Sequence, residues 1–151
     1  MNAIDRRIVR ALQKDGRMKI ADLAEAVGLS PTPCARRLER LQGDGVITGY
    51  GARVDARKLG LPVTIFVSVE LEQQGRTAIS AFERAVRHFE EVMECYLMTG
   101  SRDILLRVVA ADLDAFDAFL EHRLMKVPGI RNMRSNFALR AMVRRDALPE
   151  A

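Results

Sequence analysis

Residues 20–42 read IADLAEAVGLSPTPCARRLERLQ, and the spacing of their apolar side chains decides the fold of the first part of the chain. Apolar residues recur every three or four positions before and after Gly28-Leu29-Ser30-Pro31, which is the periodicity of a helix. Glycine permits the positive φ at which many helices end, and serine followed by proline suits the start of the next helix. The stretch therefore predicts two short helices joined by a tight turn.

Another helix precedes this pair. Apolar residues from Ile4 to Leu12 repeat at helical spacing, and Asp15-Gly16 ends the repeat. Two short helices joined by a glycine-containing turn form a helix-turn-helix, whose second helix can lie in the major groove of DNA. We therefore predict a winged-helix-like, three-helix domain with a helix-turn-helix over residues 1–45.

The last of these helices divides into an apolar and a polar face. At about 100° per residue, Cys34, Leu38 and Leu41 fall close together, and the opposite side and its flank carry hydrogen-bond donors. Such donors can contact phosphates and base edges. The predicted DNA-binding residues are Lys19, Ser30, Thr32, Arg36, Arg37 and Arg40. The alternative is a solvated basic face whose arginines pair with Glu39 or Asp44.

Charge is distributed unevenly along the 151 residues, whose formal net charge is +4. Residues 1–60 hold twelve Lys and Arg against seven Asp and Glu, whereas residues 61–151 hold twelve against thirteen. The positive field therefore belongs to the first part, which favours a polyanion as its partner and, with the predicted helix-turn-helix, double-stranded DNA. A hydrophobic content of 48% excludes a disordered tail and is enough for a second core.

The periodicity of the second part changes from helical to alternating. The predicted elements are a strand over 63–71, a helix over 79–89, strands over 92–98 and 104–109, a helix over 112–124 and a strand over 133–143. This order is that of a ferredoxin-like βαββαβ sandwich, which we predict over residues 61–151. Residues 46–60 are expected to be a linker with a short strand at its start. The fold class is therefore α+β.

Several classes of function are excluded by what the sequence lacks. Cys34 and Cys95 lie far apart and far from His88 and His122, which excludes a disulfide framework and a structural zinc site. Neither histidine has a legible nucleophile or carboxylate partner, so we expect no catalytic residues and no cofactor. There is no run of about 18 apolar residues, and charged residues occur where a signal peptide would be apolar. We therefore expect a cytoplasmic protein with no membrane partner.

Several stretches resemble the Lrp/AsnC, or feast/famine, family of transcriptional regulators. In the first half these are residues 5–8, DRRI; 20–30, IADLAEAVGLS; 36–41, RRLERL; and 45–50, GVITGY. In the second half they are 99–103, TGSRD; 127–130, VPGI; and 135–139, SNFAL. The resemblance implies promoter binding, homodimers assembled into octamers or similar rings, and an amino-acid effector lodged between subunits.

The same resemblance makes the predicted hairpin turn a candidate effector site. Gly100 would leave room for the close approach of a backbone, and Asp103 would meet a ligand ammonium group or backbone amides that grip the ligand. The candidate effector-binding residues are Gly100, Asp103, Leu113, Ser135, Asn136 and Phe137. A glycine and an aspartate in a hairpin turn more often serve the turn itself. Ile104 and Asn136-Phe137 depart from the residues usual in the family, so the identity of the effector stays open.

The predicted function is a sequence-specific transcriptional regulator, without enzymatic activity, that responds to an amino acid or a related metabolite. One alternative is a non-specific nucleoid-associated protein, which would keep the phosphate contacts and lose base reading. Another is a metabolic enzyme or enzyme-regulatory subunit, since ferredoxin-like domains serve many chemistries. Binding to promoter and random DNA at several salt concentrations separates these possibilities.

Overall fold

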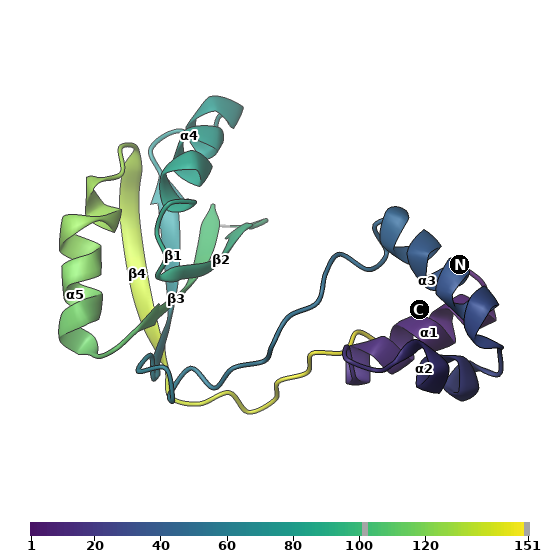
Figure 1. The fold of residues 1–151 in the computed structure, drawn as a ribbon. Helices are drawn as coiled ribbons and strands as arrows, with labels where there is room; N and C mark the ends of the chain where they lie inside the picture. The colour runs from purple at the N-terminus through teal and green to yellow at the C-terminus, as the bar shows by residue number, and fades with distance from the viewer. Residues whose placement is uncertain (101–102, 150–151) are drawn as a thin grey trace. The chain divides into compact units, whose positions relative to one another are not determined.

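Three short helices form the N-terminal part of the chain, as their apolar spacing predicts. They are α1 Ala3–Lys14, α2 Ile20–Val27 and α3 Pro31–Gly43 (Figure 1). The structure is a computed structural model that describes residues 1–100 and 103–149. α2 ends at Gly28, whose φ of +72° is the left-handed conformation that glycine adopts without strain. α3 follows at once, with Ser30 at its N-cap and Pro31 in its first turn.

The three helices share one apolar core. Its buried side chains are Ile8, Leu23, Ala24, Val27, Cys34 and Leu41. They come from the helix faces that the periodicity singled out, and fully burying a large aliphatic side chain stabilises a fold by about 1.5–3 kcal/mol. The apolar face of α3 is therefore fixed against α1 and α2, and its other side is left for solvent or a partner.

The short strand expected at the start of residues 46–60 is absent, and that prediction was wrong. All fifteen of these positions are described, and none belongs to a strand. The backbone N–H groups of Val46 and Ile47 both donate to the carbonyl oxygen of Leu41, at 3.0 and 3.1 Å. Those bonds close the end of α3 and leave the two amides unavailable for a strand ladder. The helical unit therefore has no wing strand of its own.

The C-terminal segment lies with the helices rather than with the sheet. One compact unit holds Met1–Arg53 together with the segment that begins at Met142, and the other holds Val54–Ala141. Within the first unit, Arg53 pairs with Asp146 at 3.0 Å. Met1–Arg53 carries ten Lys and Arg against six Asp and Glu, whereas Val54–Ala141 carries twelve of each. The positive charge excess thus belongs to the helical unit.

The second unit has the predicted βαββαβ order. Its elements are β1 Val63–Leu71, α4 Arg76–Val86, β2 Val92–Leu97, β3 Ile104–Ala110, α5 Leu113–His122, a 3-10 turn Leu124–Lys126 and β4 Ile130–Ala138 (Figure 1). The strands form one antiparallel sheet in the order β2-β3-β1-β4. Asp112 caps α5 as expected, because its Oδ1 accepts a hydrogen bond from the Ala115 N–H at 2.7 Å.

One face of this sheet is covered by α4 and α5. Alternate residues of β1, which are Ile65, Val67 and Val69, are fully buried against Phe82 of α4 and Phe116 of α5. The intervening residues point to the other face, as the period of two predicts. No helix in the described part of the chain is long and apolar enough to cross a membrane.

The last strand is shorter than predicted. The sequence pattern extended it to residue 143, but β4 ends at Ala138. Ala138 is opposite Thr64, and β1 begins at Val63, so β1 offers one further position beyond this pair and none to the residues from 140 to 143. Leu139 makes no strand pair and has 93% of its surface exposed. Alternating apolar residues alone therefore overestimated the strand.

Candidate DNA-binding surface and ligand-binding residues

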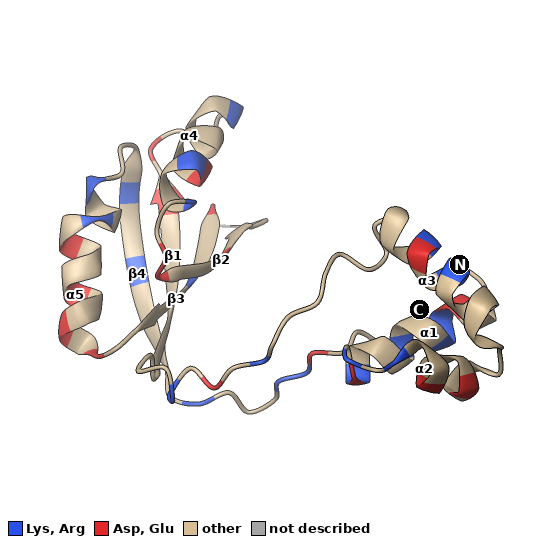
Figure 2. Cartoon of the chain, in the orientation of Figure 1, with Lys and Arg blue, Asp and Glu red and all other residues tan. Residues whose placement is uncertain are grey.

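The predicted DNA-binding residues occupy two adjoining helices of the helical unit. Lys19 is the N-cap residue of α2, and Ser30 is that of α3. Thr32 and Arg36 are exposed on α3, on the side away from the buried Cys34. Figure 2 shows blue, cationic segments on α1 and α3. α3, the helix predicted to lie in the major groove, therefore presents a polar, partly cationic side.

The first turn of α3 leaves the Ser30 hydroxyl uncommitted as a cap. A capping serine normally accepts a hydrogen bond from the backbone N–H two or three positions into the helix. The residue at the third position is Pro33, which has no N–H, and Ser30 makes no capping hydrogen bond. Pro31 removes another of the free amides, so Thr32 supplies the remaining N–H of this turn. Side chains, rather than a cluster of amides, must therefore carry most polar contacts at this end.

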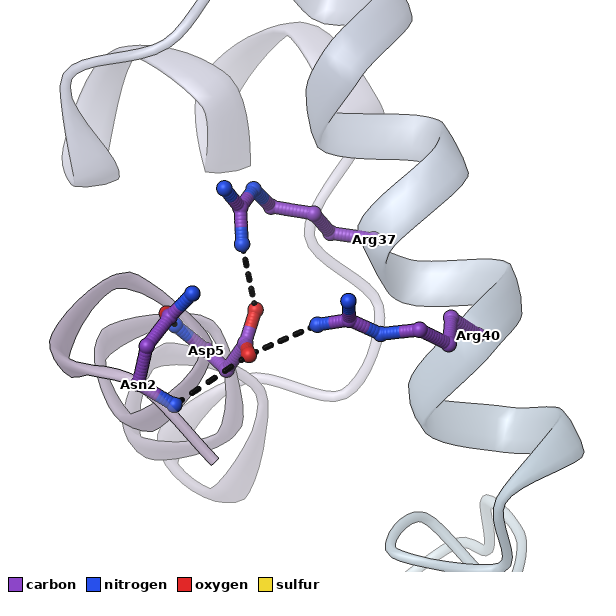
Figure 3. A network of polar contacts seen from close by, with 4 residues as sticks. All are labelled: Asn2, Asp5, Arg37 and Arg40. Atoms are coloured by element: carbon purple, nitrogen blue, oxygen red, sulfur yellow. Dashed lines mark hydrogen bonds and ion pairs between the residues drawn. The ribbon is translucent and has the colours of Figure 1, made fainter.

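A buried carboxylate lies beneath α3 and binds two of its arginines (Figure 3). Asp5 of α1 has 2% of its side chain exposed. Its Oδ1 accepts from Arg37 Nη1 at 2.9 Å, and its Oδ2 accepts from Arg40 Nη2 at 2.7 Å. The backbone N–H of Asn2 also donates to Oδ2 at 3.3 Å, and Asn2 Oδ1 in turn accepts from the Asp5 N–H at 2.9 Å. α3 is thus tied to the start of α1.

Asp5 is held in its ionised form. Burial by itself raises the pKa of a carboxyl group, because it disfavours the charged form. The hydrogen bonds from Arg37 and the Asn2 backbone, with the positive charges of Arg40 and Arg37, outweigh burial and hold the pKa of Asp5 below its ordinary value. Two cations and one anion therefore meet at this junction at neutral pH.

The three arginines of α3 consequently differ in their surroundings. Arg36 is exposed, whereas the side chains of Arg37 and Arg40 are 29% and 53% exposed and both bind Asp5. The alternative interpretation expected pairing with Glu39 or Asp44, but the carboxylate comes from another helix. A guanidinium group has five N–H donors, so Arg37 and Arg40 keep donors for a further acceptor.

One feature of the sequence points to a partner for Asp5. Asp5 precedes Ile8 by three positions and therefore lies on the apolar stripe of α1. A charged residue on a buried stripe needs a partner of opposite charge. The arginines are 32 and 35 positions away, beyond the reach of helical spacing.

Two candidate effector residues lie at the turn between β2 and β3. Gly100 has a φ of +114°, and nothing lies within 4 Å of the position of an added Cβ, so backbone conformation is what demands glycine there. Asp103 Oδ2 accepts from the Leu71 N–H at 2.8 Å, and the Asp103 carbonyl oxygen accepts from the Met98 N–H at 2.8 Å. Ser101 and Arg102 of the quoted motif lie outside the described residues.

The other candidate effector residues are not brought to that turn within one chain. Leu113 begins α5, just after the far end of β3, and seven strand residues at about 3.4 Å each separate that end from Asp103. Ser135 and Phe137 pair with Val67 and Ile65 and so share the helix-covered face of the sheet.

Asn136 is placed differently from its two neighbours. It pairs with Phe66, so it belongs to the opposite face of the sheet. Phe137 packs edge-to-face on Phe116 of α5, with ring centroids 5.4 Å apart. A single copy therefore does not assemble these positions into one pocket.

Comparison with known proteins decides the family. The model of the AsnC-type helix-turn-helix domain matches residues 1–42, and the model of the Lrp/AsnC ligand binding domain matches residues 64–148. The chain belongs to the Lrp/AsnC family of transcriptional regulators. This confirms the family, the α+β fold class and the regulatory function that the sequence predicts.

Individual relatives of this Lrp/AsnC regulator align over nearly its whole length. The Bkd operon transcriptional regulator of Pseudomonas aeruginosa is 44% identical over 149 residues, which are 99% of this chain and 97% of the relative. The crystal structure of an AsnC family transcriptional regulator from Agrobacterium tumefaciens is 41% identical with a TM-score of 0.93, covering 99% of this chain and 97% of that one. A transcriptional regulator of Neisseria meningitidis in complex with L-Met is 32% identical with a TM-score of 0.93, covering 99% and 96%.

The described part of this Lrp/AsnC regulator contains no group of three or more His, Cys, Asp or Glu that could hold a metal ion. Cys34 is buried and Cys95 is exposed, and both are free thiols.

Proposed function

We propose that this regulator recognises specific promoter sequences by placing α3 in the major groove of double-stranded DNA. The observation that carries the proposal is the fixed apolar face of α3, with Thr32 and Arg36 exposed on its other side. A helix of this kind presents side chains to base edges, and Lys19 and Ser30 stand beside it for phosphate contacts. Arg37 and Arg40 contribute through the donors that Asp5 leaves free.

The proposed effector is an amino acid held between two copies of the chain. Gly100 and Asp103 lie at one end of the sheet, and Leu113 lies beyond its other end, so a pocket lined by both groups needs a second copy. The solved relative in complex with L-Met supports an amino acid as the ligand class. A ligand at such a place would alter the assembly only to the extent that it binds one arrangement better.

The proposed assembly is a homodimer that associates further, to an octamer. The sheet face opposite α4 and α5 carries Phe66 and Tyr96, which are 37% and 51% exposed. Exposed aromatic side chains on one face of a sheet are typical of a protein contact. A dimer links two helix-turn-helix units, which raises the affinity for a matching pair of half-sites by a factor of roughly 10²–10⁴ where the geometry fits.

The protein acts as a binding protein rather than as an enzyme under this proposal, with no cofactor besides its effector. The regulators that it resembles support that role. Because its partner would be chromosomal DNA, its proposed place of action is the cytoplasm.

Selection from a pool of random-sequence duplexes tests DNA recognition directly. Bound duplexes are sequenced, and affinity for the selected sequence is compared with affinity for random DNA at several salt concentrations. Specific recognition predicts a common near-palindromic sequence and a large ratio of the two affinities. Equal affinities with a steep salt dependence would indicate a non-specific DNA-binding protein instead.

A thermal-shift screen of the twenty amino acids, with solution mass measurement, tests the effector. We expect one or a few amino acids to raise the melting temperature and to change the mass of the assembly. Turnover of an amino acid during the same incubation would contradict the non-enzymatic role.

A further inference from the structure

We infer that Asp5 is a positioning residue for DNA recognition, which acts through Arg37 and Arg40 and makes α3 discriminate between specific and random sequences. The inference rests on the proposed function, since it concerns the same reading helix. Asp5 itself is buried beneath that helix and does not reach the DNA.

The geometry fixes both arginines with one carboxylate. Each oxygen of Asp5 accepts from a different guanidinium group, at 2.9 Å from Arg37 and 2.7 Å from Arg40. The two arginines are three positions apart on α3 and so lie on neighbouring turns of one face. If either guanidinium group turned away from Asp5, one oxygen of this buried carboxylate would lose its charged donor.

The carboxylate is itself held in place from the other side. Asp5 and Asn2 exchange hydrogen bonds, with Asp5 as the third residue of α1 and Asn2 as its N-cap. Such a capping box orders the first turn of a helix. Polar contacts therefore run without a break from Asn2 through Asp5 to Arg37 and Arg40 on α3 (Figure 3).

A fixed arginine binds DNA differently from a free one. Free guanidinium groups follow any phosphate, which strengthens binding to every sequence alike. Guanidinium groups held in one direction keep their remaining N–H donors in register with only some positions of a duplex. They also lose less conformational entropy on binding. Asp5 also lowers the net charge of the junction from two to one. Both effects lower the affinity for random DNA relative to the affinity for the specific sequence.

The test compares Asp5→Asn with the unsubstituted protein on the selected and the random duplex. We expect the slope of log affinity against log salt on random DNA to steepen by up to about 0.9, the contribution of one added phosphate contact. We expect the ratio of specific to random affinity to fall about fivefold or more. A folded Asp5→Asn protein with an unchanged slope and an unchanged ratio would overturn the inference.

Glu25→Gln is the matched control. It removes one carboxylate from the same unit, and Glu25 is exposed on α2 with no side-chain polar contact among the described residues. The control should leave the ratio unchanged, because it alters total charge and not the direction of the arginines. A fall in the ratio equal to that of Asp5→Asn would assign the effect to net charge and overturn the positioning role.

A second pair of variants decides the question if Asp5→Asn does not fold. Arg37→Gln is compared with Asp5→Asn/Arg37→Gln, in which both charges of the buried pair are gone and Arg40 is released. The double variant should have the lower ratio of specific to random affinity, and equal ratios in the two variants would overturn the inference. Absence of any sequence preference in the unsubstituted protein would instead refute the proposed function, and the inference with it.

Discussion

The carboxylate oxygen Oδ2 of Asp103 accepts a hydrogen bond from the backbone N–H of Leu71 at 2.8 Å. The bond lies where the pairing of β1 with β4 shifts register, between Glu70 and Leu71. A backbone amide at such an irregularity lacks its regular strand partner, and the side chain supplies an acceptor. Asp103 therefore stabilises the sheet, in addition to the ligand contact proposed for it.

Two substitutions at Asp103 separate these roles. Asp103→Asn keeps an oxygen for Leu71 and removes the charge that would meet a ligand ammonium group. We expect it to keep the ligand-free melting temperature and to abolish the shift produced by the effector amino acid. Asp103→Ala should also lower the ligand-free melting temperature by about 3 °C, since it costs about 1 kcal/mol of hydrogen bonding. Differential scanning fluorimetry measures both, and a normal shift in the Asn variant would leave Asp103 a purely structural residue.

Arg36→Ala and Arg40→Ala should both weaken DNA binding, but they should differ in their effect on the free energy of unfolding. Arg36 is exposed, so its loss should leave the free energy of unfolding within about 0.5 kcal/mol and reduce the salt slope by about 0.9. Arg40→Ala removes one of the two arginine donors of the buried Asp5 and should cost about 1–3 kcal/mol of unfolding free energy as well.

Urea unfolding and DNA titration of both variants check this contrast. The unfolding curves give the stability difference, and the titrations give affinity at each salt concentration. Equal stability of the two variants would mean that Asp5 does not depend on Arg40. Unchanged promoter affinity in both would remove α3 as the reading helix.

Local patterns predicted the elements of this fold because each depends on neighbours in the chain. Burial of Ile8, Leu23 and Leu41 follows from helical spacing, and burial of Ile65 and Val67 follows from alternation. The order of those elements then restricts the topology to a few possibilities. The family motifs supplied the function, which periodicity alone does not contain.

Relations between distant residues were not predictable in this way. Whether a segment forms a strand depends on a free partner. The amides of Val46 and Ile47 already donate to Leu41, and residues 140–143 lie beyond the first residue of β1. The engagement of Arg37 and Arg40 by Asp5 depends on how α1 packs on α3. Sequence spacing places the arginines on a helix face but does not identify the carboxylate that they bind.

The stability of the helical unit should fall in acid because of Asp5. Its pKa is lowered in the folded state from the ordinary value of 3.8, so its contribution is complete above that value and is lost as pH falls through the lower folded value. Urea unfolding at pH values from about 7 down to about 3 measures the effect. Asp5→Asn should be about 2–3 kcal/mol less stable at pH 7 and depend less on acid. An unchanged acid dependence in that variant would place the titrating groups elsewhere.

The two thiols should react at very different rates. Cys34 has no exposed surface, and burial raises the pKa of its thiol, so little reactive thiolate forms. Cys95 is exposed on β2, although burial of its sulfur and the charge of Glu83 raise its pKa. A disulfide reagent should therefore modify Cys95 in the folded protein, faster as pH rises, and modify Cys34 only when the helical unit opens.

Labelling of Cys34 then reports the opening of the helical unit by itself. In a Cys95→Ser background, the labelling rate follows the local opening equilibrium when closing is fast. Arg40→Ala should raise that rate several-fold, and Arg36→Ala should leave it unchanged, since Arg40 is the one of these two arginines that binds Asp5. Prompt labelling of Cys34 in the unsubstituted protein would contradict the packed core that holds α3 against α1 and α2.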